Sequence, residues 1–256
     1  MLLTIDVGNT NTKLAIFDGS VLRGAWRAAT DTTRTADEYA VWLTQLMELN
    51  GLKRADVDGA IIASVVPETT FNLVTLCRRY FNTQPLVVGD PAVDLGIKAL
   101  IDHPEEVGAD RLVDAVAAQE RYGGPLIVVD FGTATTFNLV DRDGNYAGGV
   151  IAPGINLSLK ALYMAAAKLP RVDVRRPQRV IATNTVQAMQ SGIFWGYVGM
   201  IEGIVSRMRA EAEAELPVIA TGGLASLFAG ATSAITTVDS DITLRGLLLI
   251  YERNRG

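Results

Sequence analysis

The sequence predicts an α/β protein in which two related halves repeat one pattern of strands and helices. The main observation is a short motif that occurs twice, 124 positions apart: an apolar run ends in Asp, and Gly stands two residues later, at Asp6–Gly8 and at Asp130–Gly132. Strand-like runs also alternate with helical patterns, which is typical of a mostly parallel sheet with helices on its faces. The 256 residues leave room for two domains of about 125 residues each, and we place the halves at 1–122 and 123–256.

Apolar periodicity and turn signals define the elements of the first half. Asp18-Gly19 is a hairpin signal between two strands. Tyr39, Leu43, Leu46 and Met47 share one face at helical spacing and predict a helix. The expected elements are strands at about 2–7, 12–18 and 21–28, a helix over 35–49, a strand over 60–65, a helix from the Pro67 turn to about Tyr80, and a strand at about 86–88.

A long connection and one helix complete the first half. Residues 89–108 contain Gly89, Pro91, Gly96 and Pro104, and we expect them to form a loop. A helix follows over about 108–122, and Gly123-Gly124-Pro125 ends it. This breaker is the reason for placing the boundary between the halves here.

The second half repeats the opening of the first. Its longest expected element, a helix over 185–213, carries an apolar stripe that indicates core or interface packing. The stripe consists of Met189, Ile193, Met200, Ile201, Ile204, Val205 and Met208. The expected elements are strands at 126–131, 134–140 and 145–151, a helix after Pro153-Gly154, the long helix, a strand at 218–220, a helix after Thr221-Gly222-Gly223, and a helix over 243–251.

Charge and hydropathy exclude several classes of protein. The net charge is −5 and the pI is near 5.0, which gives no reason to expect nucleic-acid binding. We expect no secretory leader, because the chain begins directly with a strand. Residues 180–201 and 216–238 lack charge over a membrane-sized length, but polar residues, glycines or prolines interrupt both. We therefore expect buried segments there and no membrane span.

Cysteine and histidine are each present once. Cys77 has no partner for an intrachain disulfide, which fits a reducing cytoplasm. Its apolar neighbours predict a core position on a helix and not a nucleophile. His103 stands beside Pro104 and is expected in a surface loop. A histidine-based metal site and a catalytic triad that needs histidine are therefore excluded.

The repeated Asp motif has a specific chemical meaning. A buried strand brings an Asp to its end, Gly allows the backbone to turn tightly, and the following Thr and Asn residues offer donors to a phosphate. The Asp can hold a hydrated divalent cation or water. One such motif is a common turn, but two in matching strand contexts favour a nucleotide bound in a cleft between the halves.

The other nucleotide-binding signatures are missing from the sequence. It has no P-loop and no dinucleotide fingerprint. Two Asp loops, together with the strand that leads into Thr221-Gly222-Gly223, suit the duplicated, ribonuclease H-like fold of actin, sugar kinases and acetate kinase, in which ATP binds between two halves. We expect Thr221-Gly222-Gly223 to approach the adenosine.

Gly108-Ala109-Asp110-Arg111 is the second candidate site. An Asp in the first turn of a helix is favoured by the helix dipole, and an Arg beside it can simply be a surface residue. The same pair can also place a base and an anion clamp beside the phosphates. Phosphoryl transfer needs one carboxylate to orient the attacking hydroxyl, together with cations that neutralise charge, and the sequence offers these groups.

Taken together, the motifs resemble the type III pantothenate kinase family, the actin-like class of the enzyme that begins coenzyme A synthesis. The resemblance extends over the whole chain, and the order and spacing of the motifs are more specific than any one of them. The motifs are Asp6–Thr10, Gly108–Arg111, Asp130–Thr136, Gly148-Gly149 with Pro153-Gly154, Asn184-Thr185 and Thr221–Gly223.

This resemblance implies a reaction and a set of site residues. The reaction is phosphorylation of pantothenate by ATP with Mg²⁺, in a cytoplasmic homodimer whose active site lies at the interface. Asp110 would be the general base, and Asp130 would bind a monovalent cation, K⁺ or NH₄⁺. The ATP site would comprise Asp6, Val7, Gly8, Asn9, Thr10, Asn11, Thr12, Lys13 and Thr133, with Asp6 near the magnesium ion. The pantothenate site would comprise Gly108, Ala109, Asp110, Arg111 and, from the partner subunit, Thr185.

The chain departs from the family at two positions. Many members carry a Tyr shortly before the Gly-Ala-Asp-Arg motif, which packs on the substrate, but here Leu100 and Ile101 stand there. Many members also have Asp where this chain has Asn138. The first change affects one substrate contact, and the second is a minor polar change on a strand.

Two other functions are compatible with the same motifs. One is a different kinase of the same fold, such as a small sugar kinase, although sugar kinases of this architecture are usually much longer. The other is a regulatory role, because a transcriptional accessory factor shares the family's sequence. The presence of Asp6, Asp110, Arg111 and Asp130 together argues against a purely regulatory chain.

Overall fold

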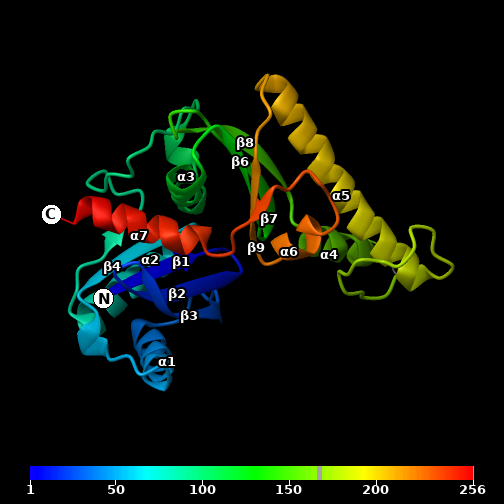
Figure 1. Cartoon of the computed structure of the whole chain (residues 1–256). Helices are drawn as coiled ribbons and strands as arrows, with labels where there is room; N and C mark the ends of the chain where they lie inside the picture. The colour runs from blue at the N-terminus through cyan, green and yellow to red at the C-terminus, as the bar shows by residue number, and fades with distance from the viewer. Residues whose placement is uncertain (166–168, 256) are drawn as a thin grey trace. The chain divides into compact units, whose positions relative to one another are not determined.

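In the computed structural model, each half of the chain forms one five-stranded sheet, and the two sheets have the same topology (Figure 1). The structure describes residues 1–165 and 169–255. In the first sheet the strand order is β3-β2-β1-β4-β5, with β1 antiparallel to β2 and parallel to β4. Its strands are β1 (Leu2–Val7), β2 (Asn11–Asp18), β3 (Val21–Ala29), β4 (Gly59–Ser64) and β5 (Leu86–Val87).

The second sheet repeats this plan with the order β10-β9-β6-β7-β8. Its central strand β6 is antiparallel to β7 and parallel to β9, as β1 is to β2 and β4. The strands are β6 (Leu126–Phe131), β7 (Ala134–Val140), β8 (Tyr146–Pro153), β9 (Val218–Gly222) and β10 (Thr237–Val238). The predicted α/β fold of two related halves is thereby confirmed. The sheets are mixed and not mostly parallel as expected, because each half opens with hairpin-connected antiparallel strands.

Helices connect the strands in both halves. The long helix and the helix after Gly108 lie close to their expected ranges, whereas β10 had no recognisable sequence signal because it is only two residues long. The helices are α1 (Ala36–Leu49), α2 (Pro67–Phe81), α3 (Ala109–Tyr122), α4 (Ile155–Ala165), α5 (Thr185–Glu211), α6 (Ala225–Ala229) and α7 (Ile242–Asn254), with 3₁₀ turns η1 (Arg54–Asp56) and η2 (Pro104–Glu106). No helix in the described ranges is long and apolar enough to cross a membrane.

The chain forms two compact units that do not follow a single cut in the sequence. Unit 1 contains 1–122, 144–146 and the C-terminal segment from 241; unit 2 contains the described residues of 123–143 and 147–240. The sequence-based division placed everything after 122 in the second half. The structure differs because α7 packs on the first sheet and on α3. The segment 144–146 pairs with the connection before α3.

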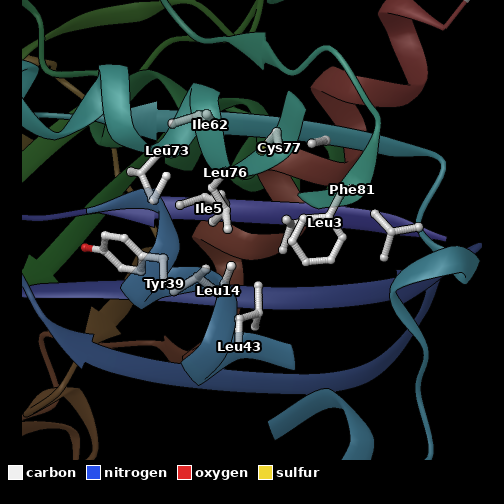
Figure 2. Close-up of a cluster of buried hydrophobic side chains, with 14 of the residues drawn as sticks. Leu3, Ile5, Leu14, Tyr39, Leu43, Ile62, Leu73, Leu76, Cys77 and Phe81 are labelled. Carbon is white, nitrogen blue, oxygen red and sulfur yellow. The ribbon is translucent and has the colours of Figure 1, made fainter. Parts of the chain in front are cut away.

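Helices cover both faces of the first sheet. On one face, Leu3, Ile5 and Leu14 pack against Tyr39 and Leu43 of α1 and against apolar residues of α2 (Figure 2). A capping box, in which the Thr35 side chain accepts from the Glu38 backbone and the Glu38 side chain accepts from the Thr35 backbone, fixes the start of α1. The other face packs against α3 and α7.

Helices α3 and α7 approach each other closely at one glycine. A Cβ atom on Gly246 would lie 2.3 Å from the Val113 carbonyl oxygen, so no larger residue fits there without a shift of backbone. Thr243 of α7 also donates to the buried Asp114 carboxylate at 2.7 Å. Together these contacts fix α3, whose first turn carries the Gly-Ala-Asp-Arg motif.

Cys77 and His103 lie where the sequence predicts. Cys77 is fully buried in α2, and burial raises the pKa of its thiol to about 12, so it is not a nucleophile at neutral pH (Figure 2). His103 is exposed in the connection between β5 and α3.

Unit 2 has an aromatic core, against which the predicted apolar stripe of α5 packs. Phe131 and Phe194 each stack on Phe228, with ring centroids 5.3 and 5.5 Å apart. The core-facing residues of α5 include Phe194, Tyr197, Val198, Ile201 and Val205. Of the predicted stripe, Met189, Ile201 and Val205 are buried, whereas Ile193, Met200, Ile204 and Met208 are only partly buried. The most buried face of α5 also carries Phe194 and Tyr197, which the predicted stripe did not include.

Candidate active site

The first Asp loop is held by backbone and hydroxyl hydrogen bonds. Strand β1 ends at Val7, and Gly8 N–H donates to the Asn11 carbonyl at 3.0 Å across the turn. Thr30 of the segment after β3 donates its hydroxyl to the Gly8 carbonyl at 2.6 Å and lies 3.0 Å from the Thr12 hydroxyl. Residues 9–11 between these anchors are exposed. The turn is therefore fixed at its base and open at its tip, as a phosphate-binding loop requires.

Asp6 and Lys13 form an ion pair at the base of this loop. They are register partners across β1 and β2, and Lys13 Nζ lies 3.6 Å from the Asp6 carboxylate. Asp6 is 7% exposed, and its burial raises its pKa to about 6, although Lys13 opposes the shift. A buried carboxylate held partly ionised beside a lysine is a group poised to accept further positive charge.

Asp110 lies in the first turn of α3, and its carboxylate folds back over Gly108. The Asp110 carboxylate accepts from the Arg111 backbone N–H at 2.8 Å. A Cβ atom on Gly108 would lie 2.7 Å from that same carboxylate oxygen. Only glycine therefore leaves enough space for the Asp110 carboxylate in this position. Burial raises the pKa of Asp110, and its charge in turn raises the pKa of Asp6. Asp6, Lys13 and Asp110 are therefore electrostatically coupled within unit 1.

Arg111 contacts a residue that sequence reasoning missed. Its Nη1 donates to the Tyr146 hydroxyl at 3.3 Å, and its guanidinium carbon lies 5.9 Å from the centre of the Tyr146 ring. Tyr146 was expected simply as part of a strand of the second half, yet it belongs to unit 1. The only available sequence signal was the preceding turn at Asp143-Gly144, and this turn gives no information about a partner 35 residues earlier.

The second Asp loop lies in unit 2 and is equally dependent on glycine. Asp130 stands at the end of β6, and its register partners are Thr136 on β7 and Thr221 on β9. A Cβ atom on Gly222 would lie 2.5 Å from the Asp130 carboxylate, and Gly222 has φ +89°. Gly154 N–H donates to the Thr133 carbonyl at 3.1 Å. The backbone of Gly222 therefore lies close to the Asp130 carboxylate and helps to fix its position.

Oxygen atoms around Asp130 have unused hydrogen-bonding capacity. Thr221 Oγ1 and Asn138 Oδ1 are buried and have no hydrogen-bond partner among the described residues. Asn138 donates through Nδ2 to the Thr136 hydroxyl at 3.1 Å. Carboxylate, hydroxyl and amide oxygens are the donors that hard cations take, so these residues fit a cation at the second loop. The described residues contain no group of three or more His, Cys, Asp or Glu side chains that could hold a metal ion, and any cation here would also need oxygen from a substrate or water.

Thr185 is the first residue of α5 and is exposed. The preceding residue, Asn184, caps the helix by accepting from the Gln187 N–H at 3.0 Å. The cap leaves the Thr185 side chain available for contact with another molecule.

The predicted site residues divide between the two units. The ATP segment from Asp6 to Lys13 and the motif from Gly108 to Arg111 lie together in unit 1. Asp130, Thr133 and Thr185 belong to unit 2. Their roles remain predictions, and each lies near the end of a strand, in a turn between strands, or at the start of a helix.

Comparison with known proteins gives one consistent family. The family model for type III pantothenate kinase matches residues 2–207. The type III pantothenate kinase of Paramagnetospirillum magneticum is 66% identical over 254 residues, which cover 99% of this chain and 98% of the relative. That of Rhodospirillum rubrum is 64% identical over 255 residues, covering 100% and 99%.

Solved structures at low identity share the fold. A structure described as a Baf family transcriptional activator from Campylobacter jejuni has a TM-score of 0.60 at 19% identity and covers 98% of each chain. A ROK hexokinase from Thermus thermophilus has a TM-score of 0.53 at 12% identity and covers 100% of this chain and 99% of its own. These likenesses place the chain in the actin-like, sugar-kinase class of folds.

Proposed function

The chain belongs to the type III pantothenate kinase family, and from this premise we propose how its residues carry out the family's reaction. That reaction is the ATP-dependent phosphorylation of pantothenate to 4′-phosphopantothenate, the first step of coenzyme A biosynthesis. The observation that carries the proposal is the grouping of Asp6, Lys13, Asp110 and Arg111 in one unit, with the first three coupled electrostatically.

We assign the general base to Asp110. In this step the carboxylate of Asp110 accepts the proton of the primary hydroxyl of pantothenate, and the hydroxyl oxygen forms a bond to the γ-phosphorus of ATP. The bond between that phosphorus and the β–γ bridging oxygen breaks, and ADP leaves. Burial raises the pKa of Asp110, and a base whose pKa lies closer to the operating pH takes up this proton more readily.

The loop from Asp6 to Lys13 would hold the phosphates of ATP. Its exposed tip offers backbone N–H and hydroxyl donors, and Lys13 supplies a positive charge at its base. Asp6 would hold the Mg²⁺ that accompanies ATP. The buried carboxylate fits this role because burial destabilises its ionised form and Lys13 offsets only part of that effect, so a further cation would stabilise it. When bound, Mg²⁺ neutralises charge on the transferred phosphoryl group and its leaving oxygen.

The second loop would complete the nucleotide site. Thr133 would contact ATP, and Asp130 would hold a monovalent cation, K⁺ or NH₄⁺, which supplies positive charge near the phosphates. The unpartnered oxygens of Thr221 and Asn138 in the described structure support this assignment. Thr221 is a register partner of Asp130 on β9, and Asn138 donates to Thr136, the register partner of Asp130 on β7.

Pantothenate would be held by residues 108–111 and by Thr185 of a second copy. The Arg111 guanidinium has several donors in a planar fork that matches a carboxylate, and pantothenate carries one carboxylate. Arg111 and Asp110 are neighbours, so the carboxylate end and the reacting hydroxyl of one pantothenate would both be bound near the start of α3.

A homodimer is supported by the distribution of exposed apolar residues. Eight of the fourteen large exposed apolar side chains of the described residues lie between positions 150 and 186, all in unit 2: Val150, Ile151, Leu157, Leu162, Met164, Val180, Ile181 and Val186. This is the stretch that leads into Thr185. Because apolar residues concentrated in one stretch favour association, we propose that it contacts the partner. The single cysteine and the coenzyme A pathway support a cytoplasmic location.

A coupled assay for ADP release tests the function directly. Purified protein is mixed with ATP, Mg²⁺ and pantothenate, with and without K⁺ or NH₄⁺, and a panel of sugars replaces pantothenate in parallel. We expect turnover that requires pantothenate and rises with the monovalent cation. Turnover only with a sugar would reassign the substrate, and no turnover with any acceptor would favour a regulatory protein of the same fold.

A further inference from the structure

We propose that Tyr146 is a positioning residue for pantothenate, which acts by holding the guanidinium of Arg111 in the orientation that receives the substrate carboxylate. The proposal rests on the role given to Arg111 under the proposed function. It adds a residue that lies outside the sequence motifs and enters the site from the first residues of β8.

The contact between Tyr146 and Arg111 has two components. Arg111 Nη1 donates to the Tyr146 hydroxyl at 3.3 Å. The guanidinium also lies over the aromatic ring, 5.9 Å from its centre, within the range at which a cation is attracted to a ring face. The hydroxyl fixes one nitrogen of the fork and the ring restricts its plane, so the remaining N–H groups of Arg111 are presented in a defined direction.

Tyr146 is itself held firmly. It is 2% exposed, and both of its backbone groups are bonded to the connection that precedes α3. Tyr146 N–H donates to the Lys98 carbonyl at 2.9 Å, and Leu100 N–H donates to the Tyr146 carbonyl at 2.7 Å. Lys98 N–H also donates to the Asn145 side chain at 3.0 Å. These hydrogen bonds fix the backbone of Tyr146, so its ring can restrict the orientation of the Arg111 side chain.

The free energy available from this arrangement comes from preorganisation. An arginine side chain loses rotamer entropy when it is fixed. If the protein already fixes the Arg111 side chain before pantothenate binds, this loss of entropy does not weaken the binding. The described residues contain no ion pair between the Arg111 guanidinium and the adjacent Asp110 carboxylate, whose contact is with the Arg111 backbone. Tyr146 thus also offers the guanidinium a partner other than the catalytic carboxylate.

The test is a double-mutant cycle with a matched control. Tyr146→Phe removes the hydroxyl and keeps the ring, and it is combined with Arg111→Ala. The control is Tyr39→Phe: Tyr39 is also fully buried in unit 1 and has an arginine, Arg34, 5.2 Å from its ring centre. The Tyr39 hydroxyl has no hydrogen-bond partner among the described residues. KM values for pantothenate and ATP, kcat, the Kd of pantothenate and the melting temperature are measured for each variant.

We expect Tyr146→Phe to raise the KM and Kd of pantothenate by about three- to tenfold, the size of one lost hydrogen bond, with kcat and the ATP KM within about twofold of the parent. In the Arg111→Ala background, Tyr146→Phe should have no further effect. Tyr39→Phe should change none of these constants.

Three outcomes would overturn the proposal, and they differ in what else they overturn. If Arg111→Ala weakens pantothenate binding but Tyr146→Phe does not, Tyr146 does not position Arg111, and the clamp role of Arg111 survives. If Arg111→Ala itself leaves the Kd of pantothenate unchanged, the clamp and the role of Tyr146 both fail. An equal effect of Tyr146→Phe with and without Arg111 would also overturn it, because it would show that the tyrosine acts on binding by another route.

Discussion

Asp6 and Asp130 occupy the same position in equivalent strands, but Asp6 faces Lys13 across its hairpin and Asp130 faces Thr136. The two sheets share one topology, so the comparison holds position by position. The two sites therefore differ locally: a lysine lies beside the Asp6 carboxylate, and a threonine hydroxyl lies beside the Asp130 carboxylate. We base their different proposed roles on this difference. The first suits a site for ATP phosphates with Mg²⁺, and the second suits a weakly held monovalent cation.

The buried Asp6 carboxylate should destabilise the ligand-free protein at neutral pH. Its pKa is raised to about 6 in the folded state, so the folded state binds a proton more tightly than the unfolded chain, and stability falls as the pH rises from about 4 through about 6. Asp6→Asn should therefore raise the free energy of unfolding by about 3 kcal/mol at pH 7 and by only about 1 kcal/mol at pH 4.5, while it abolishes kinase activity. Urea denaturation at the two pH values measures this.

The exposed Asp102 provides the control for this experiment. Asp102→Asn should change the free energy of unfolding by less than about 0.5 kcal/mol at either pH. If Asp6→Asn is no more stable than the parent at pH 7, the ionised Asp6 carboxylate does not destabilise the folded state, and this prediction is wrong.

Loss of the proposed base should reduce turnover without loss of the fold. Asp110→Asn should lower kcat by a factor on the order of 10²–10⁴ and leave the melting temperature close to that of the parent. It should also lower the pKa of Asp6, because the charge of Asp110 raises it, and an NMR titration of the Asp6 carboxyl carbon would detect this. Glu120→Gln, at an exposed position in the last turn of the same helix, is the control. Near-normal kcat in Asp110→Asn would mean that another group takes the proton.

The second loop should govern the response to monovalent cations. Asp130→Asn removes the charge that would hold K⁺ or NH₄⁺, so activation by either ion should be lost and the residual activity should be the same with and without them. Initial rates across a range of K⁺ concentration measure this. Asp143→Asn, at an exposed turn of the same unit, should retain normal activation. Unaltered activation in Asp130→Asn would place the cation elsewhere.

A charge in the exposed apolar stretch of unit 2 should disrupt the proposed dimer. Ile181 is 83% exposed, so Ile181→Glu should not affect folding of the single chain, but it would place a carboxylate against apolar residues of a partner. Sedimentation velocity should show a monomer for this variant and a dimer for the parent, and pantothenate turnover should fall because Thr185 of the second copy is lost. Val41→Glu, at a position 75% exposed on α1, should stay dimeric. A parent chain that is monomeric would contradict the interface site.

Much of the candidate site is readable from sequence because it depends on local geometry. Asp6 and Asp130 each end a buried strand and precede a glycine that the turn requires. Gly108 leaves room for the Asp110 carboxylate within the same helical turn. Such contacts join residues two to four positions apart, and residue type and spacing alone constrain them.

The sequence by itself determined the two Asp loops, the duplicated order of strands and helices, and the Asp and Arg at the start of α3, because these depend on periodicity and on short-range turn chemistry. Only the tertiary structure decided that Tyr146 meets Arg111, that α7 packs with the first sheet and that α5 turns its aromatic side to the core. The Tyr146 contact arises from pairing between the connection before α3 and the start of β8, and α7 approaches α3 through Gly246. Such contacts join residues far apart in the chain, and they depend on which surfaces fit together in space.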